Sequence, residues 1–461
     1  MKEYPMYTAT PLPWLPQLPV HWELLRNKNI FQETKEIVGD KADLYPLLSL
    51  TTKGIILRDT ASGKGKFPKD FNTYKIVRQG DMAFCLFDID ETPRTVGLSN
   101  YDGMLTGAYT IFHVKNVNSR YVYYYYLALD NVKALRSLYS GLRKTINTGT
   151  FLGTKLPVPP REEQDQIVRF LDWKVSVINR LISVKKRQIS AYKELRKATI
   201  DQGILHGFEK SEKKESGVNW LGKIPTMWEV MPLKRICRAN ASIADIVKAK
   251  DISELVTFLP MENVTETGEI NCCIKREIAE VRTGFSSFAK GDVVVAKITP
   301  CFENGKGACL DNLDTDIGFG TTEFINLRPS NKILSRYLYM ITMTRPFRKL
   351  GEEVMTGSAG QRRVSVDYIK NFVVGIPDIE EQRIILAEID QRLAQIKKAI
   401  KIESKNIANL QEFKTRLISD VVTGRIDIRD VKIPSFDMVE EDIDEEISED
   451  IVEANQKTEA E

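Results

Sequence analysis

The amino-acid sequence predicts an α+β fold in which two globular mixed α/β domains are joined by two long coiled-coil helices, in a circularly repeated order. Two repeats lead to this fold class. A proline followed by an acidic helix start, and then by apolar residues at helical spacing, occurs twice. A tryptophan–glutamate motif also occurs twice, once before each globular stretch. A chain of 461 residues is also too long for a single hydrophobic core.

The long helices are predicted at residues 161–205 and 378–424. Pro159 followed by Glu162-Glu163-Gln164 returns 218 positions later as Pro377 followed by Glu380-Glu381-Gln382. A proline before an acidic first turn is typical of a helix start, because carboxylates there meet the positive end of the helix dipole. Seam positions then follow in steps of four and three, the spacing of a coiled coil. They are Leu171, Val175, Ile178, Ile182, Lys185, Ile189 and Tyr192 in the first copy, and Ile389, Leu393, Ile396, Ile400, Glu403, Ile407 and Leu410 in the second.

Each seam contains one polar position, Lys185 in the first copy and Glu403 in the second. With a pseudo-two-fold axis between Ile182 and Lys185, Lys185 lies beside Ile400 and Glu403 beside Ile182, in layers about 4.5 Å apart by helical rise. The ammonium and the carboxylate are then predicted to meet across the seam, and a lone polar layer of this kind fixes register. The alternative is that both side chains extend outward to solvent or to a partner subunit.

A tryptophan motif precedes each globular stretch. Trp14 and Trp22-Glu23 return 206 residues later as Trp220 and Trp228-Glu229, each with a proline three residues before the second tryptophan. We interpret these tryptophans as core anchors in preference to a stacking role. The first globular domain is expected to contain short strands at residues 40–49, 74–77, 82–87 and 108–114 and a helix at 121–129.

The repeats divide the chain into seven segments. These are an N-terminal segment (1–20), a first globular domain (21–160), a first helix (161–205), a linker with the second tryptophan motif (206–227), a second globular domain (228–377), a second helix (378–424) and a C-terminal segment with an acidic tail (425–461). The turn Arg78-Gln79-Gly80-Asp81 matches Ala289-Lys290-Gly291-Asp292, whereas the loops between such landmarks diverge. The scaffold is therefore repeated and the loops are not.

Composition and charge narrow the class of protein. No apolar run approaches the roughly 18 residues of a membrane span, and no secretory signal is recognisable. The six cysteines include no C-x-x-C pair, so we expect reduced thiols in a cytoplasmic protein and no metal site. Residues 437–461 contain twelve acidic side chains and one lysine, a balance of −11, so the net charge of +3 leaves +14 on residues 1–436. A basic body is typical of a protein that meets phosphates, and the acidic end is expected to be a disordered tail.

A repeated scaffold with different loops suits a protein that recognises two different DNA half-sites, because particular side chains distinguish base edges. A coiled-coil adaptor that binds only proteins and a nuclease or catalytic fusion are the alternatives. The motifs for catalysis are missing. There is no Asp/Asn-Pro-Pro-Tyr/Phe for base methylation and no phosphate loop around Lys64. Asp378 and Glu403, the best imitation of a nuclease site, lie about 40 Å apart by helical rise.

The duplicated helix start, the paired tryptophan motifs and the two diverged domains resemble the specificity (S) subunit of a Type I restriction–modification enzyme, over about residues 10–430. Val422-Thr423-Gly424-Arg425 resembles the family's usual ending of the second helix, whereas Leu205-His206-Gly207 departs from it. The resemblance implies a non-catalytic subunit whose two target-recognition domains each read one half of a bipartite double-stranded DNA site. It also implies that the two long coiled-coil helices pack antiparallel, in a pseudo-two-fold arrangement. These helices would set the spacer and dock two methyltransferase (M) subunits, which restriction (R) subunits join. S-adenosylmethionine, ATP and Mg²⁺ then belong to those partners, and no cofactor belongs to this chain.

Basic residues in glycine-bearing stretches near the diverged segments are the candidate DNA contacts. They are Lys64, Lys66 and Arg94 in the first domain, and Lys297, Lys306, Arg362 and Arg363 in the second. Phosphate contacts of this kind make affinity depend on salt. A further hypothesis is that the acidic tail after Ser435 competes with DNA for the basic body.

Overall fold

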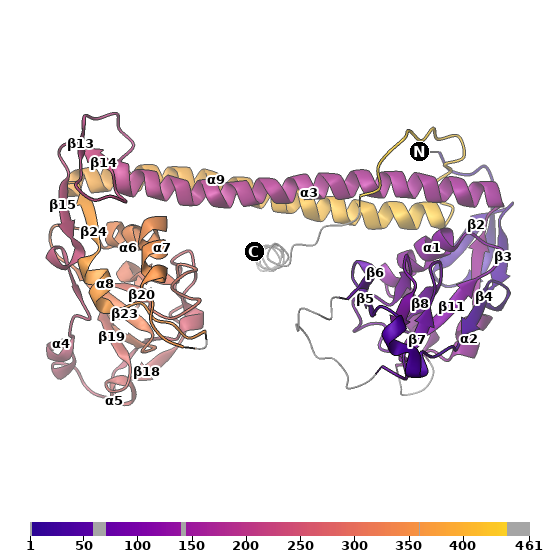
Figure 1. Ribbon diagram of the computed structural model, residues 1–461, viewed down its shortest axis with the longest axis horizontal. Coiled ribbons are helices and arrows are strands. Elements are labelled where there is room, and N and C mark those ends of the chain that lie inside the picture. Colours follow the sequence, from indigo (N-terminus) through magenta and orange to yellow (C-terminus); the bar gives the residue numbers. More distant parts are fainter. Residues whose placement is uncertain (1, 59–70, 140–143, 359, 440–461) are drawn as a thin grey trace. The chain divides into compact units, whose positions relative to one another are not determined.

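The computed structural model describes residues 2–58, 71–139, 144–358 and 360–439. The chain forms two compact units, one comprising residues 1–188 and 402–461 and the other residues 189–401. Each unit contains one globular domain and a part of each of the two long helices, α3 (Arg161–His206) and α9 (Ile379–Val422). Within each unit these two helices lie side by side (Figure 1). Among the described residues, no helix is long and apolar enough to cross a membrane.

Both long helices form where the sequence predicts them. Helix α3 has 46 residues and α9 has 44, and each has two glutamates in its first turn. Each is followed by a glycine with left-handed backbone, Gly207 (φ +68°) directly after α3 and Gly424 (φ +70°) two residues after the end of α9. Glycine adopts this conformation readily because it has no Cβ to clash. In the first unit, Asn179 and Lys185 of α3 contact Lys414 and Glu403 of α9 respectively. The residue number on α3 rises from 179 to 185 while that of its partner on α9 falls from 414 to 403, so the two helices are antiparallel.

The seam contains the predicted ion pair. Lys185 Nζ lies 2.9 Å from Glu403 Oε2, and the two side chains keep 28% and 14% of their surface exposed. The pair is therefore partly enclosed by the helices and does not extend into solvent. Asn406 Nδ2 also donates to Glu403 Oε2, at 3.1 Å. Every other predicted seam position is buried or half-buried.

The first unit is built from short antiparallel strands. Its central sheet has the order β4 (Phe31–Thr34), β11 (Thr110–Val114), β8 (Met82–Phe84), β9 (Val96–Leu98). The two-stranded pairs are β1 (Tyr7–Leu12) with β2 (Leu15–Pro19), β3 (Glu23–Arg26) with β12 (Lys155–Val158), β5 (Leu48–Thr51) with β6 (Gly54–Leu57), and β7 (Lys75–Val77) with β10 (Gly103–Leu105). Its other α-helices are α1 (Ser119–Asn131) and α2 (Thr148–Gly153).

The second unit repeats the central sheet with the order β16 (Cys237–Ala239), β23 (Phe324–Pro329), β20 (Val293–Ala296), β21 (Gly307–Cys309). Its second sheet has four strands in the order β18 (Lys275–Glu277), β17 (Leu255–Leu259), β22 (Ile317–Gly320), β19 (Ser286–Ala289), and β17 and β22 are parallel. The remaining pairs are β13 (Lys213–Glu215) with β14 (Lys223–Pro225) and β15 (Glu229–Pro232) with β24 (Val373–Ile376). The helices are α4 (Ala244–Lys248), α5 (Ile278–Val281), α6 (Ser335–Met343), α7 (Arg345–Glu353) and α8 (Val366–Asn371).

One expected strand of the first domain is wrong. Residues 40–49 were expected to be extended, but Gly39–Leu44 is a 3-10 helix and β5 begins only at Leu48. Local bonds satisfy this backbone, because the N–H groups of Lys41 and Tyr45 donate to Val38 and Ala42. Pro46 has no N–H to contribute to a strand ladder, so pairing starts after it.

The tryptophan motif and the helix-start motif meet in space. Trp22 Nε1 donates to Glu163 Oε1 at 3.0 Å, and Trp228 Nε1 donates to Glu381 Oε1 at 2.8 Å. Both indoles are buried. The interpretation of these two tryptophans as core anchors is therefore confirmed, and each glutamate fixes the orientation of one indole.

The glutamine of the helix-start motif joins each long helix to its own domain. Gln164 Nε2 donates to Pro159 O, and its Oε1 accepts the Asn118 N–H before α1 at 2.8 Å. In the second unit Gln382 Nε2 donates to Pro377 O, and its Oε1 accepts the Leu334 N–H before α6 at 2.9 Å. The repeated sequence thus makes the same two bonds in both units.

The circular order of the repeat is visible where the long helices end. A Cβ at Gly207 would meet Trp228 at 3.4 Å, and a Cβ at Gly424 would meet Trp22 at 3.3 Å and Pro19 at 2.5 Å. In the second unit the chain runs continuously from the helix end to its tryptophan motif. In the first unit the motif comes from residues 14–23 and packs on the end of α9 without following it in the chain, and Lys2 of the N-terminal segment pairs there with Asp427.

Candidate nucleic-acid interface

In the second domain, strand β20 continues into a loop, residues 297–306, that is hydrogen-bonded to the segment 362–364. The Val364 N–H donates to Lys297 O at 2.9 Å, and the Thr299 N–H donates to Arg362 O at 3.0 Å. At the far end of the loop, the Ala296 N–H donates to Lys306 O at 3.0 Å. These backbone bonds gather all four of the basic residues predicted for the second domain, Lys297, Lys306, Arg362 and Arg363.

Two of these cations are oriented by carboxylates. Arg363 binds Glu323 through two nitrogens, with Nη2 2.8 Å from Oε1 and Nε 3.0 Å from Oε2. This hydrogen bonding holds the pKa of Glu323 below its ordinary value. Arg362 Nη2 lies 3.1 Å from Glu303 Oε1. Both arginine side chains remain 42% exposed, so each guanidinium is oriented and still accessible.

A buried cation supports the loop from inside the domain. Arg348 of α7 is 8% exposed, and its Nη1 donates to Phe302 O at 2.8 Å. Its guanidinium lies over the Phe302 ring, 4.9 Å from the centroid. Burial lowers the pKa of Arg348 to about 10. Nothing in the sequence distinguishes Arg348 from the exposed arginines near it, so sequence reasoning missed this residue.

The first domain has the same backbone arrangement. The Ile146 N–H donates to Leu86 O at 2.7 Å, and the Asp88 N–H donates to Lys144 O at 2.8 Å. Adding 218 to 144 and 146 gives 362 and 364, so Lys144 is the counterpart of Arg362. Sequence analysis missed Lys144, although the 218-residue shift of the helices would have found it if carried back into the domain.

The charges around the loop of the first domain differ. Lys144 Nζ binds Asp90 at 3.0 Å and also binds Glu91. The pKa of Asp90 is lowered to about 2, first by the hydroxyl of Tyr139 and then by Lys144. Two acids therefore surround one lysine at this place, whereas in the second domain the two acids Glu303 and Glu323 lie among four cations.

Arg94, predicted as a DNA contact, lies at the end of α1. Its Nη1 is 3.0 Å from Asp130 Oδ2 and 3.1 Å from Asn131 Oδ1, and its side chain is 19% exposed. Asp130 also binds Lys133 at 2.8 Å. Arg94 thus belongs to an internal network more than to an open surface. Lys64 and Lys66 lie outside the residues that the structure describes.

The arrangement offers donors for phosphates and base edges, which guanidinium and ammonium groups bind. Within the described part of the chain, no group of three or more His, Cys, Asp or Glu could hold a metal ion. Asp378 Oδ1 instead accepts the Glu381 N–H at 2.8 Å at the start of α9, while Glu403 is paired with Lys185. The two acids that imitate a nuclease site therefore have separate structural partners.

Comparison with known proteins identifies the family. A family model described as "Type I restriction modification DNA specificity domain" matches residues 86–191 and 225–410. The chain is 36% identical over 175 residues to the Type I restriction enzyme EcoAI specificity subunit of Escherichia coli, and this match spans 37% of the chain and 29% of that subunit. It is 23% identical over 444 residues to the MjaVIII specificity subunit of Methanocaldococcus jannaschii, spanning 90% of the chain and 95% of that subunit.

A solved structure supports the fold. A chain from a study of complex assembly and conformational transition of the Type I restriction–modification system superposes with a TM-score of 0.60 at 13% identity. The match covers 89% of this chain and 99% of that one. At this level of identity the likeness concerns the fold alone, and that fold is the α+β arrangement predicted from the sequence.

Proposed function

Because this chain belongs to the family of Type I restriction modification DNA specificity proteins, we propose that it selects the DNA sequence on which a Type I restriction–modification enzyme acts. Each globular domain reads one half of a bipartite double-stranded site, and the long helices set the spacer between the halves. The observation that carries this proposal is the repeated framework, which presents a hydrogen-bonded loop at the same place in both domains with different side chains on each.

The proposed contacts follow from that loop. Lys297, Lys306, Arg362 and Arg363 would contact one half-site, because they lie on one pair of hydrogen-bonded segments and the two arginines are partly exposed. In the first domain Arg94, Lys64 and Lys66 remain proposed contacts, and we add Lys144 as the counterpart of Arg362. Among the described contacts Arg94 ranks last, because Asp130 and Asn131 already occupy its guanidinium.

The proposed partners are two methyltransferase subunits on the helices, which restriction subunits join. One face of α3 supports this docking. Val177, Leu181 and Val184 are 42%, 45% and 36% exposed, and their spacing of four and three residues places them on one helical stripe. S-adenosylmethionine, ATP and Mg²⁺ would be held by the partners, and this chain would be a non-catalytic subunit. A cytoplasmic location is proposed with this role, and the six cysteines are all free.

A domain replacement tests the proposal. Residues 21–160 are exchanged for the matching domain of a related subunit, and the modified sequence is read by methylome sequencing in a host that carries the methyltransferase subunits. One half of the recognised sequence should change and the other half should stay. A change in both halves would contradict separate reading. Failure of the assembled complex to shift duplex DNA in a gel would favour a protein-binding adaptor instead.

A further inference from the structure

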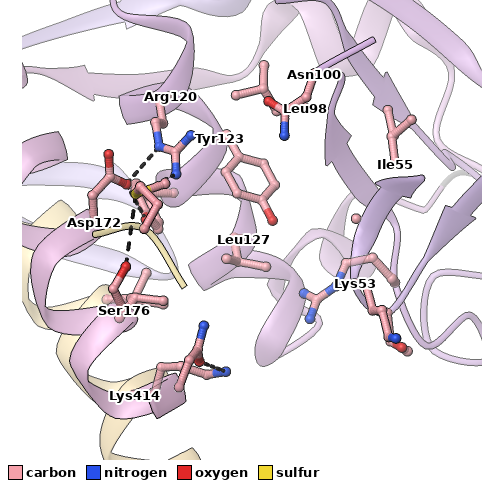
Figure 2. Close-up of a pocket in the computed structure, with 18 of the residues that line it drawn as sticks. Lys53, Ile55, Leu98, Asn100, Arg120, Tyr123, Leu127, Asp172, Ser176 and Lys414 are labelled. Carbon is pink, nitrogen blue, oxygen red and sulfur yellow. Dashed lines mark hydrogen bonds and ion pairs between the residues drawn. The ribbon is translucent and has the colours of Figure 1, made fainter. Parts of the chain in front are cut away.

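A pocket in the first unit holds the last described residues of the chain. It is a cavity of about 420 Å³ between the β5–β6 hairpin, helix α1 and the helices α3 and α9 (Figure 2). Met438 and Val439 are part of its lining. All of its lining residues belong to one compact unit.

The C-terminal strap, residues 425–439, is attached to α3 by specific bonds. Gln166 Nε2 donates to Ile428 O at 3.3 Å and to Val431 O at 2.8 Å. At the other end of the strap, the Val439 N–H donates to Ser176 Oγ at 3.1 Å, and Asn179 Nδ2 donates to Val439 O at 2.9 Å. Both backbone polar groups of Val439 are thus bonded to α3, and this fixes where the following residues begin.

The pocket is basic. Its charged lining residues are Lys53, Arg94, Arg120 and Lys414 against Asp172, and Asp130 behind the lining is paired with Arg94, which leaves a balance of +2. Figure 2 shows Arg120 bonded to Asp172 on one wall, with Lys53 on the hairpin and Lys414 on α9. Arg120 Nε lies 2.7 Å from Asp172 Oδ1, so that carboxylate is already neutralised within the lining.

The residues that follow Val439 have the opposite charge. Residues 440–461 carry eleven acidic side chains and one lysine, a balance of −10. Opposite charges attract over a Debye length of roughly 10 Å at moderate salt, and a concave site concentrates the field. A segment tethered at the rim also acts at an effective concentration on the order of millimolar. Even weak intrinsic affinity would therefore fill the pocket.

We propose that this pocket is the docking site of the acidic segment 440–461, which competes there with DNA phosphates for the first domain. The competition rests on the proposed function, whereas the docking does not. The negatively charged phosphate backbone of a nucleic acid is the other ligand that the basic pocket could bind. The chain's own segment is favoured because the strap delivers it to the pocket rim.

The test uses the full-length chain. In one variant the eleven acids of residues 440–461 are replaced by their amides, which keeps the length and removes the charge. A labelled synthetic peptide of residues 440–461 is titrated into this variant without DNA, by fluorescence anisotropy. Lys53→Glu with Lys414→Glu is the pocket variant. Lys28→Glu with Lys41→Glu, at two exposed lysines outside the pocket lining, is the control with the same change of net charge.

The peptide should bind at low salt and lose binding at high salt, because the binding of a polyanion depends mainly on charge pairs. It should bind the pocket variant at least about tenfold more weakly, and the control variant with unchanged affinity. With intact pocket residues, the amide tail should tighten non-specific duplex binding by at least about fivefold at low salt. In the pocket variant the amide tail should make no further difference.

Equal peptide binding by the pocket variant and the wild-type pocket would overturn the docking site. Peptide binding through the pocket with no effect of the tail on DNA affinity would overturn the competition. If the chain and its complex with methyltransferase subunits bound no DNA while the peptide still bound the pocket, the proposed function would fail and the docking site would stand.

Discussion

The two units share the same fold and differ in how the tryptophan motif is attached to the long helices. In the second unit Glu381 accepts one side-chain bond, from Trp228. In the first unit the equivalent Glu163 accepts from Trp22, from the neighbouring His21, and from Tyr4 of the N-terminal segment. The first unit lacks a covalent link between its helix end and its tryptophan motif. We infer that the additional hydrogen bonds take the place of that link.

They differ again at their exposed loops. The same backbone bonds present Lys144 with Asp90 and Glu91 in one domain, and Arg362 and Arg363 with Lys297 and Lys306 in the other. Loop charge is thus free to diverge because the loop backbone is held by main-chain bonds that do not depend on side-chain identity. Four predictions follow this contrast, in order of expected effect.

Replacing Glu163 should destabilise the protein more than replacing Glu381, because Glu163 accepts more side-chain hydrogen bonds. Glu163→Ala leaves the buried Trp22 and Tyr4 donors without an acceptor and should cost on the order of 2–5 kcal/mol. Glu381→Ala leaves one indole N–H unpaired and should cost about 1–3 kcal/mol. Urea denaturation followed by intrinsic fluorescence measures both. Equal losses in the two variants would mean that the N-terminal segment needs no extra attachment.

Replacing the loop cations should affect one half-site at a time. Arg363→Ala should weaken binding to the specific site by about 1–3 kcal/mol and relax selection in one half only, whereas Lys144→Ala should act on the other half. Competition gel shifts with half-site mutants measure this, and Arg416→Ala on the exposed face of α9 is the control. Relaxation of both halves by either variant would show joint reading.

The seam pair is a position where the two copies need different residues, because the antiparallel packing of α3 and α9 brings Lys185 and Glu403 together. Lys185→Glu places two carboxylates in contact and should destabilise the chain by about 1–3 kcal/mol, given that the pair is partly enclosed. Lys185→Glu with Glu403→Lys should recover most of the loss. A double variant no better than the sum of the single ones would exclude direct pairing.

Low pH should break the Lys185–Glu403 ion pair by protonating Glu403, with a smaller loss of stability than the charge reversal. The hydrogen bond from Lys185, and then that from Asn406, hold the pKa of Glu403 below its ordinary 4.5. A lowered carboxyl pKa stabilises the folded chain above about 4.5, and that contribution is lost as pH falls through the lowered pKa. Wild type and Glu403→Gln should therefore differ in urea midpoint at neutral pH and converge near pH 3. A constant difference would locate the effect elsewhere.

The sequence alone determined the features that depend on periodicity and duplication. Steps of four and three are typical of a stripe that another helix covers, so the seam could be derived from spacing. The antiparallel pairing came from the family resemblance, and the Lys185–Glu403 contact followed once that pairing was assumed. The tryptophan anchors were recognisable because two rare residues kept one interval. The strand at residues 40–49 failed because local 3-10 bonds and Pro46 outweighed a weak β pattern.

Only the tertiary structure decided which cations share a surface. Lys297 and Arg363 are far apart in sequence and come together because the loop 297–306 and the segment 362–364 exchange main-chain bonds, which have no side-chain signature. The same holds for Arg348, whose burial under Phe302 depends on how α7 packs, and for the strap, whose path follows Gln166, Ser176 and Asn179. Local periodicity fixes elements because it acts within a few residues. A binding surface joins distant segments, and its composition is set by packing.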